Sequence, residues 1–241
     1  MQYDLSRFQM GLDELNIKLT DGQIHQFLDY YEFLIEKNKV MNLTGITEFQ
    51  EVVEKHFIDS LCLIKAVPQL GKQKILDLGT GAGFPGIPLK IVFPDLEIVL
   101  MDSLNKRIHF LEEVIQRLDL KNISAVHGRA EEMARKGEYR QQFDICVSRA
   151  VANLASLAEY CIPFVKIGGC FVSYKSADVD EEAENAKRAV FLMGGKIEDV
   201  IKFRLPGSDQ GRSLIYIKKE KGTPKAYPRK AGTPARNPIL P

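Results

Sequence analysis

The fold follows from one short stretch of the sequence, Ile75-Leu76-Asp77-Leu78-Gly79-Thr80-Gly81-Ala82-Gly83-Phe84-Pro85-Gly86. An apolar run of strand length passes here into a segment with four closely spaced glycines. Glycine lets the backbone turn tightly and approach a ligand where a Cβ would collide, and Pro85 is compatible with a helix that begins there. The pattern predicts a strand, a cofactor-binding loop and a helix in succession.

Short apolar runs recur along the chain and alternate with segments of helical periodicity. With the first strand, they cover residues 75–78, 98–101, 123–126, 143–147 and 170–174. Buried-type strands that alternate with helices predict an α/β fold with a doubly wound, mostly parallel sheet. Two last strands, near 197–203 and 213–218, flank the turn residues Pro206-Gly207 and should close the sheet as an antiparallel hairpin.

The first 70 residues have a helical pattern and are expected to pack on the core as an N-terminal helical segment. Thr20-Asp21-Gly22-Gln23 has the form of a capping box, and apolar residues follow it at helical spacing. A second helix is expected over about 48–66. We expect residues 71–219 to form the cofactor-binding domain and residues 220–241 to form a proline-rich tail.

The strand ends favour an adenosine-type cofactor over a dinucleotide. A G-x-G-x-x-G fingerprint that begins at Gly79 would require glycine where Phe84 stands, and the loop lacks the Gly-Lys-Ser/Thr of a Walker motif. Asp77, which precedes the Gly79 and Gly81 positions, suits a cofactor with a cationic amino-acid moiety. Asp102 ends the second strand, where a carboxylate can accept both hydroxyls of a ribose.

The charge of the chain is unevenly distributed although the net charge is only +1 over 241 residues. Residues 1–70 carry 6 basic and 11 acidic groups, whereas residues 218–241 carry 7 basic groups, 1 acidic group and 5 of the 11 prolines. A basic end on a neutral body favours contact with a polyanion, and a merely solvated tail is the alternative.

The sequence predicts a cytoplasmic protein with no membrane segment. No stretch approaches the roughly 20 apolar residues that a bilayer span needs, and the N-terminus lacks the pattern of a signal peptide. The four cysteines have neither a CxxC pair nor metal-ligand spacing, so we expect buried, reduced thiols and no metal site.

Several motifs give the chain a specific resemblance to a known family. It resembles the bacterial ribosomal RNA small subunit methyltransferase G family, also called glucose-inhibited division protein B, among the class I S-adenosylmethionine-dependent methyltransferases. The matching pieces are Asn38–Thr44, His56-Phe57-Ile58-Asp59-Ser60-Leu61, Leu76–Pro88, Asp102–Arg107, Arg129-Ala130-Glu131, Ser148-Arg149-Ala150, Thr223-Pro224-Lys225 and Tyr227–Pro234. The glycine loop alone would indicate only a methyltransferase, and the other motifs make the match specific.

The resemblance implies an enzyme that transfers a methyl group from S-adenosyl-L-methionine to N7 of one guanine in the decoding-region loop of 16S rRNA. Its fold would be a seven-stranded sheet of class I type with an antiparallel last strand. The substrate would be free 16S rRNA or the small ribosomal subunit, and we expect a monomer. Carried over by position, the cofactor contacts are Gly79, Phe84, Asp102, Ser103, Leu104, Ala130, Glu131 and Arg149.

Guanine N7 already presents an in-plane lone pair, so the reaction needs positioning in line with the methyl group and no general base. Catalytic residues are therefore not identified, and Asn42 and Arg149 are candidates for positioning. Asn42 could read the guanine edge or cap a loop. Arg149 could hold phosphate, shape the pocket, or form an ion pair with Asp144 or Glu131. His56 and Asp59 could face the substrate, or His56 could be a satisfied histidine at a domain seam.

Basic residues near the strand ends and in the tail are candidates for RNA contact. They are Lys39, Lys106, Arg107, Lys175, Lys225, Arg229, Lys230 and Arg236. We expect removal of residues 221–241 to weaken RNA binding and its salt dependence and to leave cofactor affinity nearly unchanged.

Two other functions compete with the rRNA methyltransferase. A small-molecule methyltransferase of the same fold would have no need of the basic tail. A non-catalytic RNA-binding factor would have no need of an intact glycine loop with Asp77 and Asp102.

Overall fold

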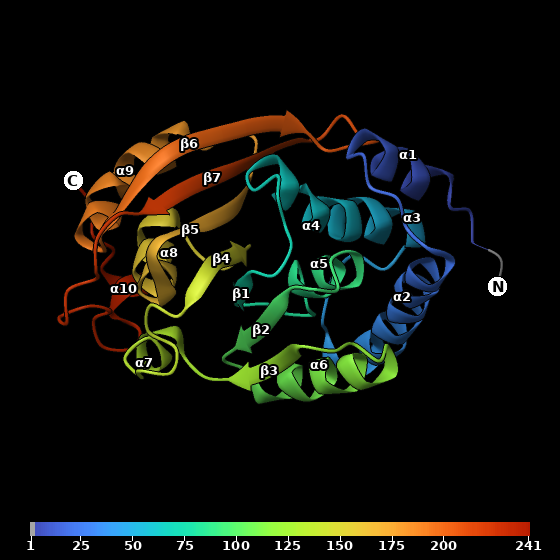
Figure 1. The fold of residues 1–241 in the computed structure, drawn as a ribbon, viewed down its shortest axis with the longest axis horizontal. Helices are drawn as coiled ribbons and strands as arrows, with labels where there is room; N and C mark the ends of the chain where they lie inside the picture. The colour runs from blue at the N-terminus through green and yellow to red at the C-terminus, as the bar shows by residue number, and fades with distance from the viewer. Residues whose placement is uncertain (1–2) are drawn as a thin grey trace.

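A computed structural model describes residues 3–241 of the chain. Its centre is a seven-stranded sheet in the order β3-β2-β1-β4-β5-β7-β6 (Figure 1). The strands are β1 (Lys74–Leu78), β2 (Glu97–Asp102), β3 (Ile123–His127), β4 (Phe143–Arg149), β5 (Val165–Ser176), β6 (Gly195–Arg204) and β7 (Gly211–Lys219). The first five pair in parallel, and β7 pairs antiparallel with both β5 and β6. The predicted fold class and the closing hairpin are confirmed.

The strand order creates a crevice at one edge of the sheet. The chain winds from β1 through β2 to β3 in one direction and then returns to place β4 on the other side of β1. In parallel sheets, such a reversal leaves a gap at the carboxyl ends of the strands, where ligands bind. The loops that follow β1, β2, β3 and β4 all lie at this edge.

Two apolar clusters cover the two faces of the sheet, because successive side chains of a strand point to opposite faces. Ile75 and Ile145 belong to one cluster, whereas their neighbours Leu76 and Cys146 belong to the other. The N-terminal helices, α5 (Gly86–Val92) and α6 (Asn105–Arg117) cover the first face. The second face is covered by α7 (Ala130–Met133), α8 (Leu154–Cys161) and α9 (Asp180–Leu192), as Figure 1 shows, and by the short helix η3 (Ile162–Phe164).

The N-terminal segment shares its apolar cluster with the sheet. Its elements are α1 (Ser6–Glu14), α2 (Asp21–Met41), α3 (Phe49–Val52), the π-helix η1 (Val53–Ile58), α4 (Asp59–Leu61) and the 3-10 helix η2 (Cys62–Lys65). The capping box at Thr20 and Gln23 is present as predicted. Phe27 and Phe57 pack 4.9 Å apart between ring centroids and belong to the same cluster as strand residue Ile75.

The single helix expected over about 48–66 is instead a run of four helical segments with different hydrogen bonding. In the π-helix, the Asp59 amide donates to the carbonyl of Glu54, five residues earlier. The wider turn shifts the following side chains around the helix axis. Phe57, Ile58 and Asp59 are consequently all buried, which a regular apolar periodicity does not predict.

The C-terminal residues are not a solvated tail. After β7, they return along α7 and α8 and include the short helix α10 (Thr233–Arg236) (Figure 1). Thr223 and Pro234 are buried. The prediction of a merely solvated tail is therefore wrong, because the backbone of this basic segment packs on the domain.

The four cysteines are buried and free, as expected. Within residues 3–241, no helix has both the length and the apolar character needed to cross a membrane.

Candidate cofactor cavity and the adjoining basic cavity

The loop after β1 depends on glycines at particular positions. Gly79 and Gly83 have φ values of +71° and +101°, which residues other than glycine rarely adopt. A Cβ on Gly79 would lie 2.4 Å from Cγ2 of Val151, and one on Gly83 would lie 2.8 Å from the Tyr30 hydroxyl. The Gly79 amide donates to the Met101 carbonyl over 2.8 Å, which fastens the loop to the end of β2. The loop is thus fitted closely between its neighbours.

Asp77 stabilises this loop by hydrogen bonds to two of its residues. Its Oδ2 accepts hydrogen bonds from the Thr80 hydroxyl at 2.7 Å and the Gly86 amide at 2.8 Å. The side chain is fully buried, its Oδ1 has no hydrogen-bond partner, and burial raises its pKa to about 6. Asp77 does not line the cavity described next, and its contact with the cationic end of a cofactor stays a prediction.

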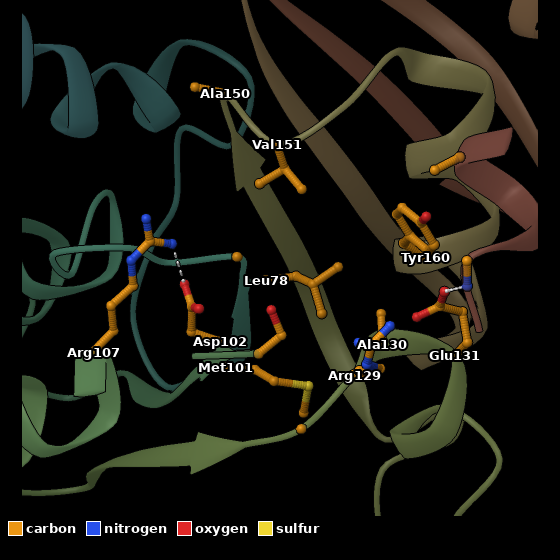
Figure 2. A pocket seen from close by; sticks show the side chains of 15 residues that line it. Leu78, Met101, Asp102, Arg107, Arg129, Ala130, Glu131, Ala150, Val151 and Tyr160 are labelled. Atoms are coloured by element: carbon orange, nitrogen blue, oxygen red, sulfur yellow. Dashed lines mark hydrogen bonds and ion pairs between the residues drawn. The ribbon is translucent and has the colours of Figure 1, made fainter. Parts of the chain in front are cut away.

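A cavity of about 480 Å³ opens at the carboxyl edge of the sheet (Figure 2). Its walls come from the ends of β1 and β2, the segments after β3 and β4, α8 and the C-terminal segment. The lining residues are Leu78, Gly79, Met101, Asp102, Ser103, Arg107, Gly128, Arg129, Ala130, Glu131, Ala150, Val151, Tyr160, Gly232 and Ala235. The residues expected at the ends of three strands therefore meet around one space.

Asp102 is the acidic group at the β2 end of this cavity. Its Oδ1 accepts from the Leu104 amide at 2.9 Å, and its Oδ2 accepts from the Gly81 amide at 3.0 Å and from Arg107 at 3.1 Å. A carboxylate offers about four acceptor positions, so one remains open on Oδ1. Asp102 can accept one ribose hydroxyl directly, and a second hydroxyl would require Arg107 to release Oδ2.

Glu131 lies across the cavity from Asp102, at the start of α7 (Figure 2). The carboxylate is largely buried, and its Oε1 accepts a 2.7 Å hydrogen bond from the Gly232 amide of the C-terminal segment. The expected cofactor residues that line the cavity are Gly79, Asp102, Ser103, Ala130 and Glu131. Those outside its lining are Asp77, Gly81, Phe84, Leu104 and Arg149.

A second cavity, of about 430 Å³, adjoins the first, and Ala150 lines both. Its charged lining consists of four cationic side chains, Lys55, Arg149, Lys175 and Arg212, and one carboxylate, Asp59. We call it the basic cavity.

Asp59 joins two of the cations in the basic cavity. Its Oδ2 accepts from Arg149 at 2.6 Å, and its Oδ1 accepts from Arg212 at 3.1 Å. The carboxylate is only 7% exposed, and the two guanidinium groups are 14% and 22% exposed. Arg149 therefore pairs with Asp59, and neither of the two partners considered from the sequence, Asp144 and Glu131, is the observed one. Asp144 instead pairs with Lys166.

His56 stacks on Phe84 beside this ion pair. The two ring centroids are 4.5 Å apart with an interplanar angle of 21°. The guanidinium of Arg149 lies over the Phe84 ring, 5.2 Å from its centroid. His56 Nε2 is 2.9 Å from the Thr44 hydroxyl. Burial, with a smaller contribution from the charge of Arg149, lowers the pKa of His56 to about 3. The imidazole is therefore neutral at physiological pH. Phe84, although part of the glycine loop, packs against His56 and is buried.

Comparison with known proteins gives a direct match. The family model "rRNA small subunit methyltransferase G" matches residues 23–210. The chain belongs to this family. The Ribosomal RNA small subunit methyltransferase G of Lachnoclostridium phytofermentans is 58% identical over 98% of each chain, and that of Acetivibrio thermocellus is 52% identical over 95% of this chain and 94% of its own.

Several solved structures share the fold of this methyltransferase G family member at low sequence identity. TrmN from Thermus thermophilus has a TM-score of 0.52 at 15% identity and covers 67% of this chain and 48% of its own. The [4+2]-cyclase SpnF has a TM-score of 0.56 at 12% identity, and the match covers 86% of this chain and 98% of the SpnF chain. The methyltransferase G family and this fold together indicate an S-adenosylmethionine-dependent methyltransferase.

The loop that contains Asn42 is organised by its neighbours in this family member. Asn42 ends α2 with a left-handed backbone, φ 51°, and is exposed. The side chain of Asn38 accepts from the amides of Leu43 at 2.6 Å and Thr44 at 2.9 Å. The Asn42 backbone caps α2, and a contact of its exposed side chain with the guanine edge stays a prediction. Asn38 is the amide that fixes the loop beside His56.

The candidate RNA contacts fall into two groups. Lys39, Lys106, Lys225, Lys230 and Arg236 are exposed. Arg107, Lys175 and Arg229 instead have carboxylate partners, Asp102, Glu182 and Glu159 respectively. The Arg229 guanidinium is also bound to the Asn237 carbonyl, which gives it a structural role, and RNA contact by this residue stays a prediction.

Arg212 lines the basic cavity and is not among the residues predicted from the sequence. It lies at the start of β7 and opposite Ser176, at the carboxyl end of β5. An antiparallel strand begins at the edge where its parallel neighbours end, so the first residues of the last strand belong to the same rim. That rule, applied to the predicted hairpin, could have identified Arg212.

Proposed function

We propose that this protein transfers the methyl group of S-adenosylmethionine to N7 of a guanine in 16S rRNA, with the guanine nucleotide held in the basic cavity. The observation that carries the proposal is the contact of two cavities at Ala150. One has acidic groups suited to an adenosine, and the other has cationic groups suited to RNA. We further infer that the protein acts as a monomer in the cytoplasm, where bacterial ribosomes are assembled.

The residues around the first cavity fit the cofactor. Asp102 offers an open acceptor position for a ribose hydroxyl, and Gly79, which has no Cβ, lets Val151 pack against the loop in the cavity wall. Ala130 and Glu131 line the opposite end, where an adenine edge would lie. S-adenosylmethionine supplies a methyl group on a positively charged sulfur when it is bound.

The residues of the basic cavity need only hold the guanine in line and exclude water. Guanine N7 carries its own lone pair, so no side chain has to remove a proton, and positioning of this kind can supply about 7–11 kcal/mol of barrier reduction. Neutral His56 fits this requirement, because burial keeps the imidazole uncharged and so adds no cation beside the purine. It lies beside the proposed nucleotide position as part of the wall.

The purine gains positive charge as it is methylated, so a free cation beside N7 would hinder the reaction. Asp59 binds Arg149 and Arg212 by direct ion pairs, so both guanidinium groups are paired and oriented before RNA arrives. Their remaining N–H groups can bind backbone phosphate, for which guanidinium geometry is well suited.

The proposal is tested by incubation of the protein with methyl-labelled S-adenosylmethionine and small ribosomal subunits that lack the modification. The RNA is then separated by size and digested to nucleosides. We expect label in 16S rRNA as 7-methylguanosine and none in 23S rRNA or transfer RNA. Label in a different nucleoside, or in all RNA classes alike, would overturn the proposal. Arg149→Ala should lower the rate at saturating cofactor more than it changes cofactor affinity.

A further inference from the structure

The C-terminal residues 223–237, which we call the strap, are fastened to the domain at their beginning. The Thr223 hydroxyl donates to the Met193 carbonyl over 2.7 Å. Arg140 donates to the carbonyls of Thr223 at 2.7 Å and Tyr227 at 3.0 Å. These bonds lead the chain from the end of β7 toward the cofactor cavity.

The centre of the strap is held by one buried carboxylate. Arg229 Nε lies 3.0 Å from both oxygens of Glu159, and Nη2 lies 2.7 Å from Oε2. The Arg229 amide also donates to Glu159 Oε1 over 2.5 Å. The Glu159 side chain is 1% exposed. Charge-assisted bonds of this multiplicity fix the orientation of a backbone strongly, so Arg229 is the main anchor of the strap.

Beyond this anchor, the strap reaches the cavity itself. Gly232 has φ +78°, and its amide donates to Glu131 Oε1 over 2.7 Å. Gly232 and Ala235 line the cavity, and the Ser156 hydroxyl holds the Pro234 carbonyl at 2.8 Å. Figure 2 shows the Glu131 carboxylate between the cavity and the backbone nitrogen that it accepts from.

We propose that the strap is a wall of the cofactor cavity and that Arg229 and Glu159 are positioning residues for Glu131. Loss of the anchor frees Gly232, and Glu131 then loses the hydrogen bond that directs its carboxylate. The inference rests on the cofactor assignment in the proposed function and does not depend on the identity of the RNA. It also changes the expectation that removal of residues 221–241 leaves cofactor affinity nearly unchanged, since that removal deletes part of the wall.

The test measures binding of S-adenosylmethionine by calorimetry to the full-length protein and to variants. We expect Arg229→Ala to weaken binding about tenfold or more, the equivalent of losing one good charge-assisted contact. Arg229→Lys should restore part of the affinity. Arg188→Ala is the matched control, because Arg188 is an exposed arginine that contacts the Leu240 carbonyl at the end of the chain, outside the cavity. It should bind the cofactor as the wild type does.

A double-mutant cycle separates positioning from a general loss of structure. If Arg229 acts through Glu131, the double variant Glu131→Ala/Arg229→Ala should bind the cofactor no more weakly than Glu131→Ala alone. Additive losses, or wild-type affinity in Arg229→Ala, would overturn the inference. Urea unfolding of each variant identifies any that fail to fold, and Arg229→Lys then serves in the cycle. A wild type that binds the cofactor and does not methylate RNA would refute only the proposed function.

Discussion

Gly79 and Gly81 share a left-handed backbone and differ in their surroundings. Their φ values are +71° and +62°, and an added Cβ meets Val151 at Gly79 but nothing within 4 Å at Gly81. Both alanine variants should lose roughly 1–2 kcal/mol of stability from backbone strain. Only Gly79→Ala should also displace Val151 in the cavity and weaken S-adenosylmethionine binding, measured by calorimetry. Equal affinities in the two variants would contradict the close fit at Gly79.

His56 should give stability a specific pH dependence. Its pKa is about 3 in the folded protein, below the ordinary 6.5, so between these values the unfolded chain binds more protons. The His56 contribution is fully present above pH 6.5 and is lost as the pH falls, by up to about 1.4 kcal/mol per pH unit. Asp77, whose pKa is raised to about 6, acts in the opposite direction between pH 4 and 6.

The difference between wild type and His56→Gln isolates this contribution. We expect the difference in unfolding free energy, from urea titrations at pH 5.0 to 6.5, to change with the slope given above. A difference that is constant across this range would mean that His56 is protonated in the folded protein or exposed to water.

At the residue scale, the sequence predicts positions at strand ends better than the direction in which side chains point. Asp102 and Asp77 both end or nearly end a strand, but Asp102 lines the cavity and Asp77 turns beneath the loop to bind Thr80 and Gly86. Arg229 has the residue type and the basic surroundings of an RNA contact, and only packing reveals its partner Glu159, 70 residues away.

Among the elements, α2 is linked to the glycine loop through one hydroxyl. Tyr30 is fully buried, and its hydroxyl donates to the Ala82 carbonyl. Tyr30→Phe should cost about 1–3 kcal/mol, because the buried carbonyl loses its partner, and should raise the KM for S-adenosylmethionine.

Tyr31→Phe is the control for this link, since Tyr31 donates to the Thr47 carbonyl at 3.0 Å, away from the glycine loop. It should lower stability and leave that KM unchanged. Steady-state methyl transfer with varied cofactor distinguishes the two variants, and the same KM in both would exclude α2 as a support for the loop.

Element prediction succeeded where a local pattern is sufficient and failed where tertiary contacts decide. The hairpin of β6 and β7 follows from the turn at Pro206-Gly207 and two apolar runs. The π-helix Val53–Ile58 has no local signal, because the wide turn is maintained by packing of Phe57 and by the ion pairs of Asp59 with two distant arginines. The strap likewise depends on long-range partners.

On the scale of the whole molecule, the basic C-terminal segment combines an inner face on the cofactor cavity with exposed lysines. Lys225 and Lys230 are exposed and are candidates for phosphate contact. Replacing both by alanine should reduce the slope of log affinity for RNA against log salt by about 1.4–1.8, the value for two lost phosphate contacts. Cofactor affinity should stay as it is.

Lys121 and Lys187 provide a charge-matched control for this prediction. Both form surface ion pairs, with Asp119 and Glu184. Their double alanine variant should keep the salt slope of the wild type in filter-binding titrations with 16S rRNA. The same decrease in both double variants would mean that the net charge of the molecule, and not the strap, determines RNA affinity.

The most direct measurement of the central claim is the position and chemical nature of the methyl group. The protein is incubated with S-adenosylmethionine and either small subunits or protein-free 16S rRNA, and N7-methylguanine is located by borohydride reduction and aniline cleavage. The account predicts one new cleavage, at a single guanine of the decoding-region loop, in at least one of the two substrates. If neither substrate is cleaved, although calorimetry shows that the cofactor binds, the account is contradicted.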